Sequence, residues 1–270
     1  MHALRAPTRA ARPHGSARAL SRPATASTPS TTTTALVATL GSGARLVNDL
    51  LAAVAPLDRG SLATPSDRAR VDALARDIEE RMPATRAAAS ALGGTWRLVY
   101  ISSPEVFRQS PFFDSFSAAV GDRGVAEAIF TFTDALPMAR VGAATQTIDL
   151  EGESGGAGRL VSEVELAVGE LPFFPGLRGV VESTAAIEGV VADGPSYRLD
   201  MRMMQTRVTN SLFTPLGGDA VVAPVEEALT RVRGPGAARV TYAITALADD
   251  NRLRVTHAEG TGLLMIHVRE

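Results

Sequence analysis

The spacing of apolar residues changes at a glycine pair in the first half of the chain, and this change limits the fold more than any other feature. Before Gly93-Gly94, apolar residues recur at helical spacing from residue 43 to residue 92. After the pair, apolar and polar residues alternate in short segments separated by Gly, Asp, Asn and Pro, as in strands joined by turns. We expect nine strands, near 95–102, 126–133, 142–150, 159–168, 178–192, 196–208, 239–247, 252–257 and 262–268.

Consecutive short strands with almost no helix between them predict an antiparallel up-and-down β-barrel, because closing the sheet removes its exposed edges. At about eight strands, such a barrel leaves room for one small ligand. The clearest turns are the Ala-Asp-Gly-Pro-Ser cluster at 192–196 and Ala-Asp-Asp-Asn at 248–251. The fold class we predict is mainly β, with two or three N-terminal helices ahead of a barrel over 94–269.

The helices are expected between residues 43 and 92. The second begins at a capping box, with Thr64 as N-cap, Pro65 in the first helical position and Asp67 closing the box, and Pro83 ends it. Apolar stripes run along both helices, at Leu46, Leu50, Val54 and Leu57 and at Val71, Leu74, Ile78 and Met82. The helices either close one end of the domain or anchor it to a lipid surface. We favour closure, because neither polar face is an arginine-rich strip.

The first 40 residues have a composition of their own. No acidic residue precedes Asp49, and Ser, Thr, Ala and Pro surround Arg5, Arg9, Arg12, Arg18 and Arg22. An arginine-rich, acid-free segment without a continuous apolar core is typical of an organellar transit peptide rather than a secretory signal. We therefore expect residues 1–40 to be a removable leader and residues 41–270 to be one domain. The alternative is a disordered tail.

The net charge and the hydropathy of the chain limit the kinds of partner that we expect it to bind. After Ala35 the chain carries 22 arginines and 29 acidic residues, and so a formal charge of −7, which disfavours nucleic acid. No apolar run approaches the roughly 18 residues of a membrane-spanning helix. Any membrane contact is therefore expected to be peripheral, and the sequence leaves the oligomeric state open.

Side chains for catalysis or metal binding are scarce. The chain has no cysteine, and two of its four histidines lie in the expected leader. The other two, His257 and His267, fall on adjacent predicted strands without the third ligand that a catalytic zinc site requires. No phosphate-binding glycine motif follows a strand, so we expect no metal, no cofactor and no enzymatic activity. For an enzyme, the acid or base inside the barrel would come from Asp149, Glu163, Asp200 or His257.

Alternation within two strands predicts which residues line the interior. The strand from 196 to 208 has apolar residues on one face and charged residues on the other. Its methionines suit ligands of variable shape, although methionine also fills ordinary cores. We predict that the following residues point inward and bind the ligand: Trp96, Leu98, Tyr100, Tyr197, Leu199, Met201 and Met203.

The segment between the first two strands is rich in phenylalanine. Residues 104–120 include Phe107, Phe112, Phe113 and Phe116. These rings form a lid over the barrel mouth, a patch that dips into a membrane, or a short helix packed on the barrel. Of these residues, we include Phe112, Phe113 and Phe116 in the predicted ligand site.

Three patches resemble the plastid lipid-associated (fibrillin) family. Gly94-Thr95-Trp96-Arg97-Leu98-Val99-Tyr100 is similar to the family's first strand, and residues 141–149, Val-Gly-Ala-Ala-Thr-Gln-Thr-Ile-Asp, to its glutamine strand. The C-terminus resembles the family most closely, with Val-Thr-Tyr at 240–242, Asp-Asp-Asn-Arg-Leu-Arg-Val at 249–255 and Glu-Gly-Thr-Gly at 259–262. The motif residues are Gln146, Asp149, Tyr242, Asp250, Arg254 and Gly260. His257-Ala258 departs from the family's Arg-Gly, and Ser162 from its common asparagine.

The resemblance implies a lipocalin-like barrel without an agreed catalytic residue. It also implies import into the plastid and a place at plastoglobules or thylakoids, in peripheral contact with a lipid monolayer or the thylakoid membrane. The expected activity is binding, transport or sequestration of lipids or other apolar molecules, such as prenyl quinones, carotenoids or fatty acids. Two alternatives stay open: a structural coat of plastid lipid droplets, and an accessory subunit of a prenyl-quinone or carotenoid enzyme.

Overall fold

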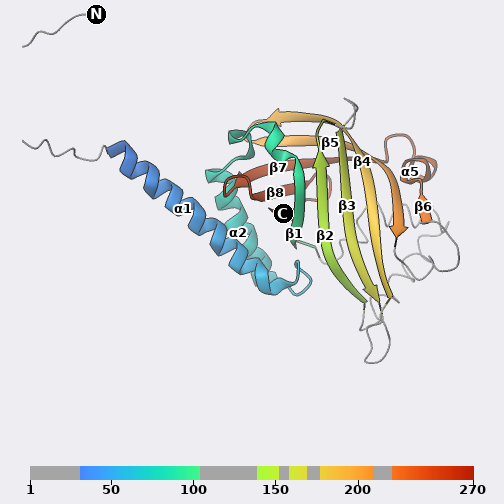
Figure 1. Cartoon of the computed structure of the whole chain (residues 1–270), viewed down its shortest axis with the longest axis horizontal. Helices are drawn as coiled ribbons and strands as arrows, with labels where there is room; N and C mark the ends of the chain where they lie inside the picture. Colours follow the sequence, from blue (N-terminus) through green and yellow to red (C-terminus); the bar gives the residue numbers. More distant parts are fainter. Residues whose placement is uncertain (1–30, 104–138, 152–157, 169–176, 210–220) are drawn as a thin grey trace, which may run out of the picture. The chain divides into compact units, whose positions relative to one another are not determined.

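The structure, a computed structural model, describes residues 31–103, 139–151, 158–168, 177–209 and 221–270 (Figure 1). The chain divides into residues 1–38 and a larger unit from Thr39 to Glu270, which contains the whole sheet. The helical elements are α1 (Thr31–Val54), η1 (Ala55–Leu57), α2 (Pro65–Arg81), η2 (Ala84–Arg86), η3 (Ala89–Leu92) and α5 (Val225–Arg233).

Eight antiparallel strands close into a barrel. The described strands are nine, of which all but β6 form the barrel: β1 (Gly94–Ile101), β2 (Ala139–Asp149), β3 (Gly158–Val168), β4 (Leu177–Asp193), β5 (Ser196–Thr209), β6 (Val221–Ala223), β7 (Arg239–Ala248), β8 (Leu253–Ala258) and β9 (Leu263–Arg269). Their order is β4-β3-β2-β1-β9-β8-β7-β5, and pairing of β4 with β5 completes the circle. The short β6 pairs with β5 beyond the end of β7. The predicted antiparallel barrel is confirmed.

The elements differ from the prediction at three places. The strand expected at 126–133 lies outside the described residues. Neither β6 nor α5 was predicted, although Val225 and Leu229 are spaced as on one helix face and both are buried. Helix α1 begins at Thr31, before the expected residue 43, because its first turn is a run of threonines whose low helix propensity hides the start.

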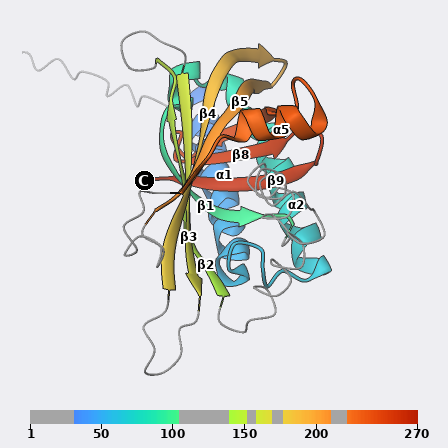
Figure 2. The ribbon, with the colours of Figure 1, turned by 90° about the vertical axis from the view of Figure 1, so that its right-hand side faces the viewer.

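The barrel interior contains the larger core cluster. This cluster includes Trp96 of β1, Ile148 of β2, Leu160 of β3, Ala185 of β4, Leu199 of β5 and Ile244 of β7. Strands on all sides of the barrel contribute to it, and only the interior brings such strands together. Helix α5 adds Val225 and Leu229 and lies beside β5, as Figure 2 shows.

A plug closes one end of the barrel. Segments η2 and η3 place Ala84 and Leu92 in the interior cluster. The indole Nε1 of Trp96 donates to the carbonyl of Leu92 at 2.9 Å, and the hydroxyl of Tyr197 donates to the carbonyl of Ala87 at 2.8 Å. Arg269 donates to the carbonyl of Gly93 at 2.7 Å from the last strand. The plug is therefore tied to β1, β5 and β9.

Helices α1 and α2 cover the outer face of β7, β8 and β9. Their buried residues, Val47, Leu50, Val54, Val71, Ala75 and Ile78, form a second core cluster with Ala246, Leu253, Val255 and Ile266 of the sheet. Helix α2 starts at the expected capping box, in which the amide of Asp67 donates to Oγ1 of Thr64 at 3.2 Å. The two helices thus cover the side of the barrel rather than the end that the sequence predicted, where η2 and η3 lie instead, and both faces of β8 are consequently buried.

A β-bulge in β1 reverses the orientation of Tyr100. Leu98 pairs with His267, but Tyr100 pairs with the next residue of β9, Ile266, so Val99 is extra. Tyr100 therefore turns to the outer face and packs in the helix-covered cluster with Val255. The prediction that Tyr100 points into the barrel is wrong, because simple alternation takes no account of the bulge.

Candidate functional site

Most of the predicted interior residues do point inward. Trp96, Tyr197, Leu199, Met201 and Met203 are buried in the interior cluster. Leu98 lies further along β1 and packs with Met265 in a smaller cluster. Phe112, Phe113 and Phe116 lie outside the described residues. The structure thus brings six of the predicted residues to one inner surface, and their role in ligand binding stays a prediction.

Two apolar clusters of different size occupy the interior. The large cluster runs from the plug along six strands to α5, which precedes β7 and lies beside β5 toward the opposite end. At the ends of β1 and β8 and the start of β9, a smaller cluster has three buried members among the described residues, Ile101, Ala258 and Met265, with Leu98, Tyr242 and Leu263 partly buried beside them. The strand ends joined by residues 104–138, 169–176 and 210–220 all lie on this opposite side in the pairing register.

Between the two clusters lies a buried arginine. Arg254 projects inward from β8 and is only 1 % exposed. Its Nη2 donates to Oε1 of Gln146 on β2 at 2.5 Å. Its Cζ lies 4.8 Å from the centre of the Trp96 ring, a cation–π distance. The indole and the amide therefore hold the guanidinium in one place.

The guanidinium is incompletely satisfied. Within the part of the chain that the structure describes, Nε and Nη1 of Arg254 have no hydrogen-bond partner. Burial lowers the pKa of Arg254 to about 9, so the group still carries its charge at neutral pH. A buried cation with unpaired donors costs several kcal/mol relative to a solvated one. Such a group requires either a ligand or ordered water.

Two more polar side chains lie beside Arg254 in the barrel interior. His267 of β9 is paired directly opposite Arg254, and Thr256 follows Arg254 by two residues on the same face. Nδ1 of His267 and Oγ1 of Thr256 are buried, again without a partner among the described residues. Burial, followed by the nearby charge of Arg254, lowers the pKa of His267 well below its ordinary value, so the imidazole is neutral. Burial raises the pKa of the Tyr242 phenol, which interacts electrostatically with Arg254.

The family-motif residues separate into two groups in space. Gln146 and Arg254 meet in the interior, and Tyr242 lies beside Arg254. Asp149 is exposed at the end of β2, and Asp250 and Gly260 are exposed in turns with left-handed φ angles of 51° and 84°. Aspartate and glycine adopt that conformation most readily, which gives Asp250 and Gly260 a structural role.

Sequence reasoning missed His267 and Thr256. The strand Leu-Arg-Val-Thr-His-Ala of β8 places Arg254 and Thr256 on one face and Leu253 and Val255 on the other. Alternation alone assigns the polar face to solvent. The helices, however, cover the face of Leu253 and Val255, so the polar face turns into the barrel. The helices predicted before the barrel were the available signal, because a strand that helices cover on its outer side must turn its other side into the barrel.

None of the four residues named as interior acids or bases lies inside. Neighbouring residues Ile148, Ser162, Leu199 and Thr256 face inward, which places Asp149, Glu163, Asp200 and His257 on the outer face. Asp200 accepts hydrogen bonds from Arg198 and Thr241 there. The enzyme alternative therefore lacks the interior acid or base that these four residues would have supplied, because each occupies the alternate position of its strand.

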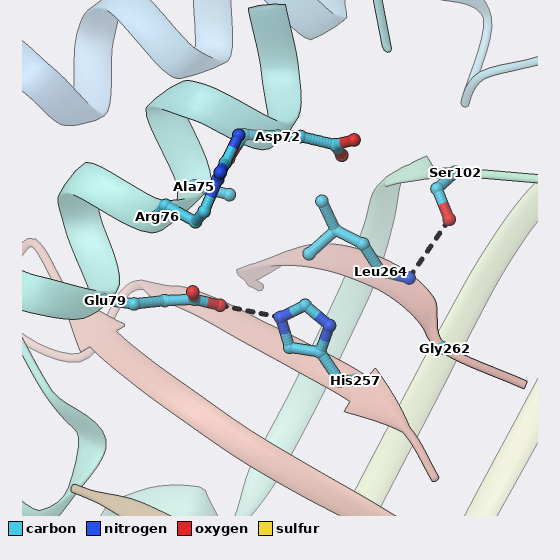
Figure 3. A pocket seen from close by; sticks show the side chains of 8 residues that line it. All are labelled: Asp72, Ala75, Arg76, Glu79, Ser102, His257, Gly262 and Leu264. Carbon is cyan, nitrogen blue, oxygen red and sulfur yellow. Dashed lines mark hydrogen bonds and ion pairs between the residues drawn. The ribbon is translucent and has the colours of Figure 1, made fainter. Parts of the chain in front are cut away.

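His257 instead lines a cleft between α2 and the β8–β9 hairpin, shown in Figure 3. The cleft has a volume of about 420 Å³ and is lined by Asp72, Ala75, Arg76, Glu79, Ser102, His257, Gly262 and Leu264. The side chain of Glu79 reaches across it from α2, and Nε2 of His257 lies 2.7 Å from its Oε1. Ser102 accepts a hydrogen bond from the amide of Leu264 at 3.1 Å on the other side.

The polar groups of the cleft attach the helix to the sheet. Glu79 also accepts a hydrogen bond of 2.8 Å from Oγ1 of Thr245 on β7. Burial raises the pKa of Glu79, but the hydrogen bonds from His257 and Thr245 outweigh burial and hold the pKa below its ordinary value. The carboxylate is therefore ionised and satisfied, and its visible role is to fix α2 against β7 and β8.

Neither a metal site nor a membrane-crossing helix is found in the described ranges. No three His, Asp or Glu side chains there come close enough together to hold a metal ion. No described helix combines the length and the apolar character that a bilayer crossing requires.

Comparison with known proteins gives two matches. The family model PAP_fibrillin matches residues 44–188, more than half of the chain. The chain is also similar to a probable plastid-lipid-associated protein 5, chloroplastic, of Arabidopsis thaliana, with 35 % identity over 65 residues. This segment is 24 % of the chain and 28 % of that relative, so well under two thirds of the relative's length is covered. No solved structure matches the chain.

Proposed function

The chain belongs to the plastid lipid-associated (fibrillin) family, a family of plastid proteins, and on that premise we propose that it binds lipids or other apolar small molecules inside its barrel. The binding is non-enzymatic and serves transport or sequestration. Prenyl quinones, carotenoids and fatty acids are the candidate ligands. The place of action is the plastoglobule or the thylakoid surface.

The observation that carries this proposal is the inner surface of the barrel. It is mostly apolar, and the plug closes it at one end, so we assign ligand entry to the other end. Barrels of this strand number hold one small ligand. The smaller cluster of Ile101, Ala258 and Met265 lies toward the entry end. This is the part of the interior that we assign to the apolar ligand.

The N-terminal segment bears on where the protein acts. We propose that residues 1–40 contain a plastid transit peptide, on the strength of their arginine-rich and acid-free composition. N-terminal sequencing of protein purified from plastids should begin between about residues 31 and 43. A mature protein that still starts at Met1 or His2 would contradict this assignment.

The deciding experiment is mass spectrometry of the organic extract from protein purified out of its own plastid. We expect one class of apolar compound in near-stoichiometric amount. Titration with that compound should then be weakened by Ala258→Phe, which fills the interior near the entry end. Val191→Phe is the matched control, because Val191 is exposed on β4.

A coat protein of lipid droplets would behave differently. Its extract would contain bulk droplet lipid without a preferred class, and Ala258→Phe would change nothing. Its attachment to droplets would instead be lost when Phe112 and Phe113 are both replaced by Ser. That pair of results would replace internal binding with a structural role.

A further inference from the structure

We propose that the polar cluster inside the barrel, formed by Arg254, Gln146, Thr256 and His267, binds the carboxylate of a long-chain carboxylic acid. The proposal rests on the proposed binding function and names the ligand class. The ligand is an acidic amphiphile, with its headgroup at Arg254 and its apolar chain along the inner surface.

The first argument is the set of unused polar groups. Four buried atoms of three side chains have no partner among the described residues: Nε and Nη1 of Arg254, Oγ1 of Thr256 and Nδ1 of His267. Two of these four atoms are obligatory donors, and the threonine hydroxyl and the imidazole nitrogen can also donate. Buried donors are almost always paired in folded proteins, so their convergence on one inner face indicates a missing acceptor.

The second argument is charge. In the described part of the chain, the ionisable groups that act on Arg254 are the phenol of Tyr242 and the cation of Arg269, with no carboxylate among them. Arg269 donates to the backbone carbonyls of Ala91, Gly93 and Asn251, so its hydrogen bonds are already committed to the plug. One uncompensated positive charge is left, at Arg254, and a monoanion neutralises it.

The same charge discriminates among the candidate ligands. A carotene offers no acceptor to a guanidinium, and a quinone offers only neutral carbonyls. A phosphate dianion would leave one negative charge unpaired in a buried site, at a cost of several kcal/mol. A carboxylate matches both the charge and the planar geometry of the guanidinium.

The third argument is position. In the β7–β8 and β8–β9 pairings, Arg254 is next to Leu247 and His267, whereas Ala258 at the entry end is next to Tyr242 and Leu263. Thr256 lies between them on the same face. A headgroup at Arg254 therefore leaves the chain pointing toward the apolar cluster of Ile101, Ala258 and Met265. The charged end is deep and the apolar end is near the entry.

The guanidinium of Arg254 is also held in a fixed position. Arg254 is fixed by its hydrogen bond to Gln146 and by its contact with the Trp96 ring. Trp96 in turn donates to the carbonyl of Leu92, and Arg269 lies 4.2 Å from its ring centre. A preorganised cation loses little conformational entropy on binding, which favours affinity for the anion.

Calorimetric titration of the full chain with oleate, oleyl alcohol and methyl oleate tests the proposal. The three probes share one chain and differ in charge. We expect oleate to bind at least about 10-fold more tightly than the other two, as a charge-assisted hydrogen bond predicts. Arg254→Met should abolish that preference and leave the affinity for oleyl alcohol within about 2-fold. Arg252→Met, which removes an exposed arginine from the preceding turn, should keep it.

Folding of the variants is checked by circular dichroism. If Arg254→Met does not fold, Thr256→Val replaces it and should reduce the preference for oleate without abolishing it. Equal affinity of the wild type for oleate and oleyl alcohol overturns the carboxylate site and leaves apolar binding standing. Failure of all three probes to bind overturns both proposals. Retention of the preference in folded Arg254→Met also overturns the site.

Discussion

Arg254 donates a hydrogen bond of 2.5 Å to Gln146 across the barrel interior, joining strands whose residues are 108 positions apart. The two residues belong to different sequence patches, and each is buried, at 1 % and 8 % exposure. No other hydrogen bond to this guanidinium occurs among the described residues. The amide of Gln146 is therefore what keeps an inward-facing cation from being wholly unsatisfied.

Replacing Gln146 should show by how much the unpaired guanidinium of Arg254 lowers the free energy of unfolding. Gln146→Leu leaves Arg254 buried without any hydrogen bond, so the free energy of unfolding should fall by about 1–3 kcal/mol. The double variant Gln146→Leu/Arg254→Met should be more stable than Gln146→Leu, because removing both partners removes the unpaired charge. Urea denaturation measures both. Additive losses in the double variant would show that the pair does not interact.

His267 should make the fold sensitive to acid. Its pKa in the folded chain lies well below the ordinary value of 6.5, because burial and the charge of Arg254 oppose protonation. Above pH 6.5 neither state binds the proton. Below it the unfolded chain is protonated first, so stability falls by about 1.4 kcal/mol per pH unit until the folded pKa is reached.

His267→Leu should remove this contribution. Between pH 7.5 and pH 5.5, the wild type should lose about 1.4 kcal/mol more than the variant, measured by urea denaturation. The comparison uses the change within each protein, so a general effect of the substitution on stability cancels. Parallel stability curves for the two proteins would mean that the pKa of this imidazole is the same in the folded and unfolded chains.

Glu79 should stabilise the fold through its ionised carboxylate, which accepts hydrogen bonds from His257 and Thr245. Burial raises its pKa, but the hydrogen bonds from His257 and Thr245 outweigh burial and place the folded pKa below the ordinary 4.5. The stabilisation is thus complete above pH 4.5 and is lost as the pH falls through the folded pKa. Glu79→Gln should be about 1–2 kcal/mol less stable than the wild type at pH 7, and the gap should narrow below pH 4.5. A gap that is constant down to pH 3 would contradict an ionised contact.

Tyr100 offers a test of the bulge in β1. Its hydroxyl is buried against the helices without a partner among the described residues, and burial raises its pKa. Tyr100→Phe should therefore leave the melting temperature unchanged or raise it, because the unpaired hydroxyl is removed. Tyr100→Ala should cost about 3–5 kcal/mol through the cavity it leaves. A clear loss of stability in Tyr100→Phe would mean that the hydroxyl has a partner.

Alternation and turn chemistry predict much of this barrel from sequence. The cluster at 192–196 joins β4 to β5, and Asp249, Asp250 and Asn251 take left-handed φ angles of 52°, 51° and 65° between β7 and β8. These are the residue types that accept such angles. These turn positions therefore derive from local chemistry.

The bulge in β1 and the polar cluster in the interior could not be predicted from the local sequence. An extra residue at Val99 reverses one face of β1, and nothing in the sequence around it marks the insertion. Arg254 sits on the polar side of an alternating strand, which a single strand assigns to solvent. Its burial depends on helices far away in sequence covering the other side. Tertiary context, rather than propensity, decides both positions.

The inward methionines should respond to enlargement as core residues. Met201 and Met203 are 2 % and 8 % exposed, and both pack in the interior cluster that also contains Leu229 of α5. Enlarging either to Phe inserts a ring into a packed region, so each substitution should lower the free energy of unfolding by about 1–3 kcal/mol.

Met204→Phe is the matched control, because Met204 is 38 % exposed on the same strand and its enlargement should change stability by less than about 0.5 kcal/mol. Urea denaturation compares the three variants. If Met201→Phe and Met203→Phe kept wild-type stability but lost affinity for an apolar ligand, the methionines would line an open pocket, as their strand pattern indicates. If they lost stability and kept affinity, the ligand would lie on the other side of the interior, beside Ile101, Ala258 and Met265. The packing of both methionines in one cluster with Leu229 and the plug favours the second result.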